Sequence, residues 1–413
     1  MLTALIKTID FVKGLRHRRL FLKISLATLI LVCIGYLLGW FIYLTPQMFA
    51  SGQAWMYLIV DYVNNDEIDP DAMFSKGFSG LQHALLHHDV GISQGIIESM
   101  LQLLEDDHTS YITPAQYEAF YDRIEGTYVG IGVIIAIDDS DRLIIDYTLH
   151  DSPAETEGIK AGDIIIAIDG ESAEGQTIDW AAQHLRGEAD TSVTLTVIHP
   201  GETGPVDIIV TREVIDYPSV YAEEIEENIV YIRLTSFSSN SADQFVAELE
   251  DLLDDETIGI IIDVRNNPGG LVSDAVTIVS QFVTAGSHVT HQVDGESNVI
   301  HTYEADEGGI ATDPALRIAV LQNNNSASAS EMFAGALKDL RANTQIVGQT
   351  SYGKGSINYI RELVDGSGLS ISFSYWTTPN GSFVGGSGIE PDIDVEDAGE
   401  QLDAALDYIK GTP

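Results

Sequence analysis

Two residues in the C-terminal half of this 413-residue chain have the types and surroundings that nucleophilic chemistry needs. Ser328 lies in a run of small residues, 325–331, between an apolar stretch and a helical pattern. Lys354 lies in the Gly-rich segment 351–356. A serine can attack a carbonyl carbon if a nearby base takes its proton, and a lysine can be that base when desolvation lowers its pKa. The pair is therefore a candidate Ser-Lys dyad.

Lysine is scarce in the C-terminal nine-tenths of the chain. After residue 44 it occurs only at Lys76, Lys160, Lys338, Lys354 and Lys410, among a large excess of Asp and Glu. A lysine within a Gly-rich turn of such an acidic chain needs a reason, and activation of a serine supplies one. The alternative is a lysine that is simply solvated at a turn.

An attacked carbonyl also needs donors for its oxyanion. The amide of Ala329 is one candidate, because Ser328 is expected at a helix N-terminus, where N–H groups are unpaired. Gly269 or Gly270, after the preceding apolar strand, could supply another, since glycine allows close backbone approach. In the alternative interpretation the serines at 326, 328 and 330 only cap a helix.

The segment 348–355 also resembles a phosphate-binding loop. That motif needs Ser or Thr directly after the lysine, followed by a helix. Here Gly355 follows the lysine, and residues 357–363 alternate between apolar and polar as a strand does. We therefore reject a nucleotide-binding loop and expect no cofactor.

The elements around these residues follow a strand–helix succession. From residue 214 onward we expect an α/β sheet whose chemistry lies at the carboxyl ends of its strands. Its strands are expected at 229–234, 258–264 and 318–321, the second buried on both faces, and its helices at 241–253, from after Gly270 to 282, and at 330–340. Residues 118–212 show short strands with Gly turns, and residues 51–113 show a helical pattern that includes 92–104.

Histidines at 83, 87 and 88 lie on one of these helical stretches. Their spacing could bind a metal, but no His-Glu-x-x-His order accompanies it, so we favour a plain helix face and expect no metal site. Cys33 is the sole cysteine, which excludes a disulfide framework and a cysteine nucleophile after the apolar segment.

The chain carries 20 basic and 63 acidic residues, a formal charge of −43. Six of the basic residues precede residue 24, so the remainder has 14 basic against 62 acidic residues, or −48. Such a charge repels nucleic acid and anionic lipid. We interpret the charge as an adaptation to a high-salt or alkaline habitat, where screening relieves self-repulsion.

Residues 24–44 contain no charged side chain and are long enough to span a bilayer. We expect an uncleaved transmembrane anchor, with a cleaved signal peptide as the alternative. The basic cluster before it places the N-terminus in the cytoplasm and everything after residue 45 outside.

Six segments resemble, in order, those of the carboxy-terminal processing proteases, also called tail-specific proteases: 104–111, 152–170, 232–237, 263–270, 326–331 and 352–355. This resemblance implies that Ser328 is the nucleophile and Lys354 the general base. Members of the family usually carry a Gln four residues after the lysine, where it orients the dyad. This chain has Asn358 there, so the resemblance implies the same catalytic role for Asn358. The interval from Ser328 to Lys354 is one residue longer than the family's.

The resemblance also implies a PDZ domain, a fold that binds an extended C-terminal peptide as an added strand and holds its carboxylate with loop amides. The candidate loop is Gly130-Ile131-Gly132. The alternative is a purely structural role for these glycines.

We therefore expect a cytoplasmic tail (1–23), an anchor (24–44), a helical region (45–117), a PDZ domain (118–213) and a protease core with a ClpP/crotonase-like α/β sheet (214–413). The expected function is a membrane-anchored serine endopeptidase, periplasmic or extracellular, that recognises apolar C-terminal tails. A homo-oligomer or an activating adaptor stays open as a further partner. The alternative from another class is a non-catalytic anchored PDZ scaffold.

Overall fold

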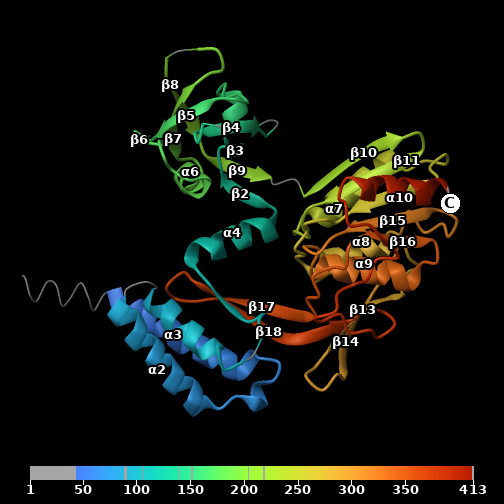
Figure 1. Cartoon of the computed structure of the whole chain (residues 1–413), viewed down its shortest axis with the longest axis horizontal. Helices are drawn as coiled ribbons and strands as arrows, with labels where there is room; N and C mark the ends of the chain where they lie inside the picture. Colours follow the sequence, from blue (N-terminus) through green and yellow to red (C-terminus); the bar gives the residue numbers. More distant parts are fainter. Residues whose placement is uncertain are drawn as a thin grey trace, which may run out of the picture. The chain divides into compact units, whose positions relative to one another are not determined.

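The computed structural model describes residues 43–87, 91–104, 106–138, 140–149, 152–202, 204–216 and 219–411. Its contacts divide it into two units (Figure 1). The helical unit comprises the described residues up to Tyr117 together with Asn358–Phe373, and the larger unit comprises Glu118–Ile357 and the described residues from Ser374 onward. The expected anchor at 24–44 lies outside the described residues except for its last two. Within the described ranges, no helix is long and apolar enough to cross a bilayer.

The helical unit is built around three helices. Residues 43–61 form the first, and α2 and α3 pack against each other after it (Figure 1). Its elements are η1 (Asn65–Glu67), α2 (Pro70–His87), α3 (Ile92–Leu101) and β1 (Ser110–Ile112), with α4 (Pro114–Glu125) leading into the larger unit. The expected helix at 92–104 therefore ends three residues early, at Leu101.

A distant stretch of sequence completes the core of the helical unit. Leu363, Leu369 and Ile371 are buried in the same apolar cluster as Leu58 and Ile97. Leu363 lies directly after β17 (Ser356–Glu362), and Leu369 and Ile371 lie in β18 (Gly368–Thr377). β1 pairs antiparallel with the first part of β18, Ser110 opposite Ser370. Our sequence analysis placed 358–373 with the protease core, whereas the contacts group it with the N-terminal helices.

A small β-rich domain begins the larger unit. Its main sheet has the strand order β3-β4-β5-β7-β8, with β6 beside β5, and β2 pairs separately with β9. The elements are β2 (Thr127–Gly130), β3 (Val133–Ile137), β4 (Leu143–Thr148), α5 (Pro153–Thr156), β5 (Ile164–Ile168), β6 (Glu171–Ser172), α6 (Ile178–Leu185), β7 (Ser192–Ile198), β8 (Val206–Thr211) and β9 (Glu213–Asp216). Its core includes Ile145, Ile168 and Leu195, each fully buried.

The remainder of the larger unit is an α/β domain. Its sheet has the order β10-β11-β12-β15-β16-β19, parallel except for β10. The elements are β10 (Val220–Glu226), β11 (Ile229–Leu234), α7 (Ser241–Leu252), β12 (Gly259–Asp263), α8 (Val272–Ser280), β13 (His288–Val293), β14 (Val299–Glu304), β15 (Arg317–Gln322), α9 (Ala329–Leu340), β16 (Thr344–Gly348), β19 (Ile393–Asp394) and α10 (Glu400–Lys410). β13 pairs with β14 and with the last residues of β18.

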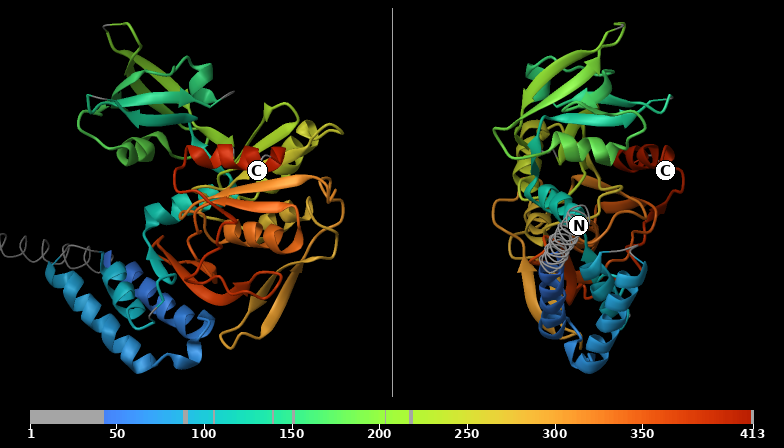
Figure 2. Two further views of the ribbon diagram at one scale, coloured as in Figure 1. Left: turned by 45° about the vertical axis from the view of Figure 1, so that its right-hand side comes forward. Right: turned by 90° about the vertical axis from the view of Figure 1, so that its left-hand side faces the viewer.

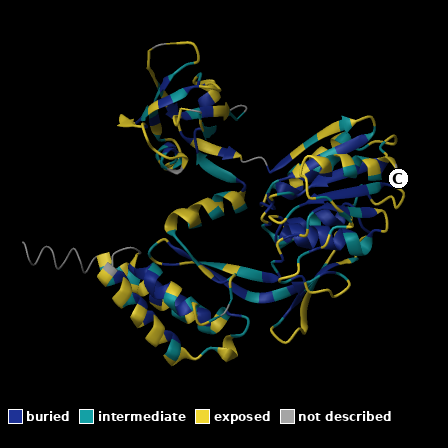
Figure 3. Ribbon diagram, in the orientation of Figure 1, coloured by how far each residue is buried: buried dark blue, intermediate teal, exposed yellow. Residues whose placement is uncertain are grey.

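Strand β12 shows why this sheet needs helices on both faces. Every one of its residues is buried. Ile260 and Ile262 belong to a cluster that also contains residues of α7, α8 and α9, whereas Ile261 belongs to a second cluster with residues of α10. Alternate side chains of a strand point to opposite faces, so the helices cover both sides, as Figures 2 and 3 show. The prediction of a strand buried on both faces is confirmed.

Arg341, directly after α9, holds several loops of this domain together. Its buried guanidinium donates to the carbonyl oxygens of Phe282 and Ala311 through one nitrogen and to those of Asp313 and Leu316 through the other, over 2.6–2.9 Å. Burial lowers its pKa from the ordinary arginine value. The four carbonyls would lose their donors together if the side chain were removed.

We predict that Arg341→Ala destabilises the protein by about 3 kcal/mol, because buried carbonyls left without donors cost about 1–3 kcal/mol each before relaxation. Urea denaturation would measure the change in the free energy of unfolding. The matched control is Arg142→Ala, which removes a half-exposed guanidinium that is paired with Asp138 and should change stability by under about 1 kcal/mol. Equal effects of the two substitutions would contradict the prediction.

Candidate active site

Ser328 stands at the junction between strand β15 and helix α9. It is partly exposed and has φ +55° and ψ −114°. A non-glycine residue at positive φ is uncommon and costs about 1–3 kcal/mol, a strain that persists only where surrounding contacts enforce it. Helix α9 begins at the next residue, Ala329, one position before the expected start at Ser330. The hydroxyl is thus presented at a helix N-terminus.

Glu331 is the contact that enforces this geometry. Its carboxylate is fully buried. One oxygen, Oε2, accepts the backbone N–H of Ser328 (2.8 Å) and that of Lys354 (2.9 Å). The other, Oε1, accepts the Ser351 hydroxyl and the Gly353 N–H, each at 2.6 Å. A single side chain therefore fixes both members of the predicted dyad through their backbones.

Two further hydrogen bonds hold the turn that carries Lys354. The Tyr352 N–H donates to the carbonyl of Ser326 (2.9 Å), and Trp376 Nε1 donates to the carbonyl of Lys354 (2.8 Å). Trp376 is itself fully buried. Lys354 is partly buried. This favours a lysine held in a fixed turn over one that is simply solvated. Ser356–Glu362 continues as strand β17, which confirms the strand expected after this turn.

The glycine loop after β12 lies against the serine. A Cβ on Gly269 would come within 2.9 Å of Ser328 Cβ and of the Ala329 nitrogen, and within 2.6 Å of the Ala327 carbonyl oxygen. A Cβ on Gly270 would lie 2.0 Å from the Phe237 carbonyl oxygen. Glycine is required at both positions, because a side chain would clash with the Ser328 segment at Gly269 and with the Phe237 backbone at Gly270.

The three expected oxyanion donors differ in their availability. The Gly269 N–H already donates to Asn267 Oδ1 (2.9 Å). Among the hydrogen bonds of the described residues, none uses the N–H of Gly270 or Ala329. The geometry therefore favours Gly270 and Ala329 as donors, while Gly269 acts by its small size. Buried Asn267 joins the two loops, since its carbonyl accepts from the Ala327 N–H (3.0 Å).

Asn358 belongs to the helical unit by its contacts. Its Nδ2 donates to the carbonyl of His108 (2.8 Å) and to the Ser370 hydroxyl (3.0 Å). The neighbouring Asp106 accepts the Thr109 hydroxyl at 2.6 Å, and Thr109 Oγ1 accepts the Ser372 N–H at 3.0 Å. The 104–111 motif thus joins the end of the helices to strand β18 within this unit. The role that the resemblance implies for Asn358 stays a prediction.

The Asp263-Val264-Arg265 motif is structural rather than part of the dyad. Arg265 contacts both carboxylate oxygens of Asp263, which raises the arginine pKa, and also reaches the Gln401 side chain of α10. Tyr231 donates to the same carboxylate (2.7 Å), and burial raises its pKa. The carboxyl end of β12 is thereby tied to α10 while the following residues turn toward Ser328.

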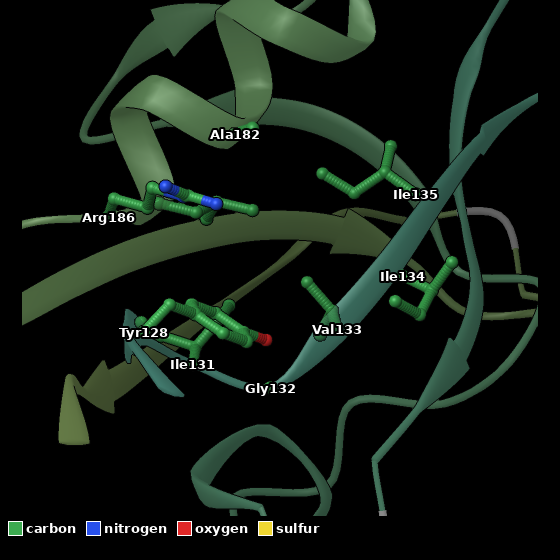
Figure 4. A pocket seen from close by; sticks show the side chains of 10 residues that line it. Tyr128, Ile131, Gly132, Val133, Ile134, Ile135, Ala182 and Arg186 are labelled. Atoms are coloured by element: carbon green, nitrogen blue, oxygen red, sulfur yellow. The ribbon is translucent and has the colours of Figure 1, made fainter. Parts of the chain in front are cut away.

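The β-rich domain carries an apolar groove of about 140 Å³ between edge strand β3 and helix α6 (Figure 4). Val133 and Ile135 lie on one side, and Ala182 and Leu185 on the other. The loop Gly130-Ile131-Gly132 closes one end. The carbonyls of Ile131 and Gly132 accept from Ala154 and Leu149, and no described hydrogen bond uses their N–H groups.

Arg186 and Tyr128 lie at the same end of the groove (Figure 4). The guanidinium lies over the tyrosine ring, 5.4 Å from its centroid, and pairs with Asp122 of α4. Burial raises the pKa of Asp122, and Arg186 opposes that rise. The groove is therefore apolar along its length and basic at one end.

Sequence reasoning missed Glu331, Asn267 and Trp376 as residues of the site. Glu331 had a signal, since an acid three residues into a helix is placed to accept the backbone N–H of the capping residue. Asn267 and Trp376 had none, because their roles depend on contacts with residues distant in the chain. Among the described residues, no group of three His, Cys, Asp or Glu side chains could hold a metal ion.

The chain is similar to known proteins in both of its β-containing domains. Residues 228–395 match peptidase family S41, and residues 145–198 match a PDZ domain. The carboxy-terminal processing protease CtpA of Bacillus subtilis is 32% identical over 308 residues, which cover 75% of this chain and 65% of that protein. The carboxy-terminal-processing protease of Bartonella bacilliformis is 33% identical over 319 residues, which cover 76% of this chain and 72% of that protein.

The chain thus spans just under two thirds of the length of the Bacillus relative. Among solved structures, a protein assigned to the S41 proteases from Bacteroides fragilis has a TM-score of 0.55 at 14% identity, with 87% of this chain and 97% of that chain covered. At this identity the likeness concerns the fold alone.

We predict that Glu331→Gln lowers kcat by about 100-fold or more with a much smaller change in KM, because an amide NH₂ would face N–H donors and misplace the dyad. Steady-state cleavage of a peptide substrate, with the thermal midpoint as a check of folding, would measure this. Glu256→Gln changes an exposed carboxylate and should leave both constants unchanged. A variant that keeps its kcat would show that Glu331 does not position the dyad.

Proposed function

Since the chain belongs to peptidase family S41, we propose that it is a serine endopeptidase that processes the C-terminal regions of proteins with a Ser328–Lys354 dyad. The observation that carries this proposal is the buried Glu331 carboxylate, whose Oε2 accepts the backbone N–H of both residues. This contact holds the backbones of the serine and the lysine in place, as a catalytic dyad requires. Two loops that were only solvated would need no such contact.

The proposed reaction proceeds through an acyl-enzyme. Lys354 Nζ in its neutral form takes the Ser328 proton as Oγ attacks the peptide carbonyl, and the N–H groups of Gly270 and Ala329 stabilise the oxyanion. The ammonium then returns the proton to the leaving amine. A water molecule gives a proton to Lys354 and attacks the ester. As the acyl group leaves, the ammonium passes that proton to Ser328 Oγ, and the released acid ionises to the new carboxylate. This chemistry uses side chains and backbone only.

The PDZ groove is proposed to recruit substrates by their C-terminal tails. An extended peptide would add as a strand to the free edge of β3, with its carboxylate at the Gly130–Gly132 amides. The apolar lining by Val133, Ile135 and Leu185 favours apolar terminal side chains. The tail-processing relatives support a role of this kind.

We also propose that residues 24–44 anchor the protein in a membrane, with the catalytic part on the extracytoplasmic side. The support is the uncharged length of that segment and the basic cluster that precedes it. The scaffold alternative is disfavoured, because a decayed site has no need of the Glu331 contacts.

We predict that Ser328→Ala and Lys354→Met each lower kcat/KM by about 10⁴-fold or more while the fold is retained. An assay of a folded-protein substrate with an unstructured apolar tail, in low and in molar salt, would measure the loss. Ser287→Ala and Lys76→Met are the matched controls and should retain activity. Tail binding without cleavage by the wild-type chain at both salt concentrations would favour the scaffold function.

We predict that Ala182→Trp raises KM for tailed substrates by about tenfold, because the indole would fill the groove and exclude a terminal side chain. The comparison is with Ile209→Trp, which adds the same side chain at an exposed position on β8. Binding of a fluorescent apolar-tailed peptide, measured by anisotropy, should weaken only in the first variant. Unchanged peptide binding would place recognition elsewhere.

A further inference from the structure

The uncharged N-terminal stretch continues past the proposed anchor. Residues 24–60 contain no Asp, Glu, Lys, Arg or His. About 20 apolar residues are sufficient to cross a bilayer, so the run extends well beyond that need. Its later part, from residue 43, is the first helix of the helical unit, 43–61. This helix therefore lies next to the proposed anchor in the sequence and carries no charge before its last residue, Asp61.

The same helix leaves large apolar side chains exposed. Phe49 is 67% exposed, Met56 49% and Val60 64%. The spacing of seven and four residues places them on one face. On the adjoining helix α2, Phe74 is 70% and Phe78 55% exposed. These five residues, with Met48, form what is called here the apolar face. Large apolar side chains exposed on neighbouring helices are typical of a contact with a membrane or another protein.

A groove of about 340 Å³ is lined by three residues of the apolar face, Met48, Phe74 and Phe78. Helix 43–61 contributes Met48 and Trp55, α2 contributes Phe74 and Phe78, and α3 contributes Met100. None of the residues that line it carries a charge. The groove lies inside one unit, so its shape does not depend on the rest of the chain. Its lining is rich in aromatic side chains, which are enriched where proteins meet the bilayer interface.

Charge decides which partner fits this face. At low ionic strength a net charge of −43 repels other acidic surfaces, including a second copy of the chain. A zwitterionic lipid surface carries no net charge and rewards burial of Phe, Met and Trp side chains. The proposed anchor ends four residues before Met48 and would bring that surface close to the apolar face.

A proline between the proposed anchor and the apolar face favours a bend in the chain. Pro46 lies between the end of the anchor and Met48, and proline has no N–H to donate to the carbonyl four residues earlier. A helix bends most readily at such a point. Helix 43–61 is thus able to turn from the direction of a membrane span and lie along the bilayer surface.

We propose that the apolar face docks on the outer surface of the bilayer beside the anchor, as an interfacial membrane-binding site. This inference rests on the membrane anchoring in the proposed function. The helical unit is then held against the lipid headgroups by Phe49, Phe74 and Phe78 rather than tethered through the anchor alone.

The test uses the full chain with Cys33→Ser and one new cysteine, Phe74→Cys or Phe78→Cys, labelled with a bimane fluorophore. The control is Glu98→Cys, an exposed position on α3 that does not line the groove. Each protein is reconstituted into phosphatidylcholine vesicles with or without acyl chains brominated near the headgroup. We expect emission at 74 and 78 to fall about twofold or more with brominated lipid and emission at 98 to be unaffected, because only the apolar face would reach the acyl chains.

The outcomes separate docking from anchoring and from activity. Vesicles that float with active peptidase but show no quenching at 74 or 78 would overturn docking and leave the proposed function intact. Protein that fails to float with vesicles would overturn both docking and anchoring, while peptide cleavage by the same sample would still test the dyad. Labels that are shielded only when two chains share a vesicle would identify a second copy as the occupant and overturn the proposal.

Discussion

The catalytic half of this protein depends on one buried carboxylate. Glu331 would be costly to bury alone, and four donors from two separate loops compensate for its desolvation. The donors of the two loops provide the hydrogen bonds that the buried carboxylate needs, and the carboxylate in turn holds the two loops in place. Ser328 can retain a strained backbone at φ +55° because this contact and the glycine loop hold it there.

The surrounding α/β sheet explains how this contact arises. β12 and β15 are parallel neighbours, so their carboxyl ends bring the Gly269–Gly270 loop and Ser328 to the same edge. β16 lies next to β15, and the Lys354 turn follows it in sequence. Three consecutive strands of the sheet therefore deliver the nucleophile, the proposed base and the oxyanion loop without any long excursion of the chain.

Sequence reasoning found these parts because each has a local signature. Small residues before a helix indicated Ser328, Gly-rich turns indicated Lys354 and Gly269–Gly270, and a continuous apolar run indicated β12. It failed where a role depends on distant partners. Residues 357–363 have the alternation of an ordinary strand, and nothing local shows that Leu363 and Leu369 fill the core of the N-terminal helices. Arg341 likewise gave no sign that four carbonyls surround it.

The sharing of β18 between the units has a consequence for synthesis on the ribosome. The β-rich domain is one continuous stretch, 127–216, and can close as soon as that stretch has emerged. The helical unit starts earlier in the chain but needs residues up to Ile371 for its core. Its loop must close across some 250 residues, which slows formation of non-local contacts. The helical unit thus emerges early but is completed late, and its exposed apolar helices must wait until residue 371 has been translated.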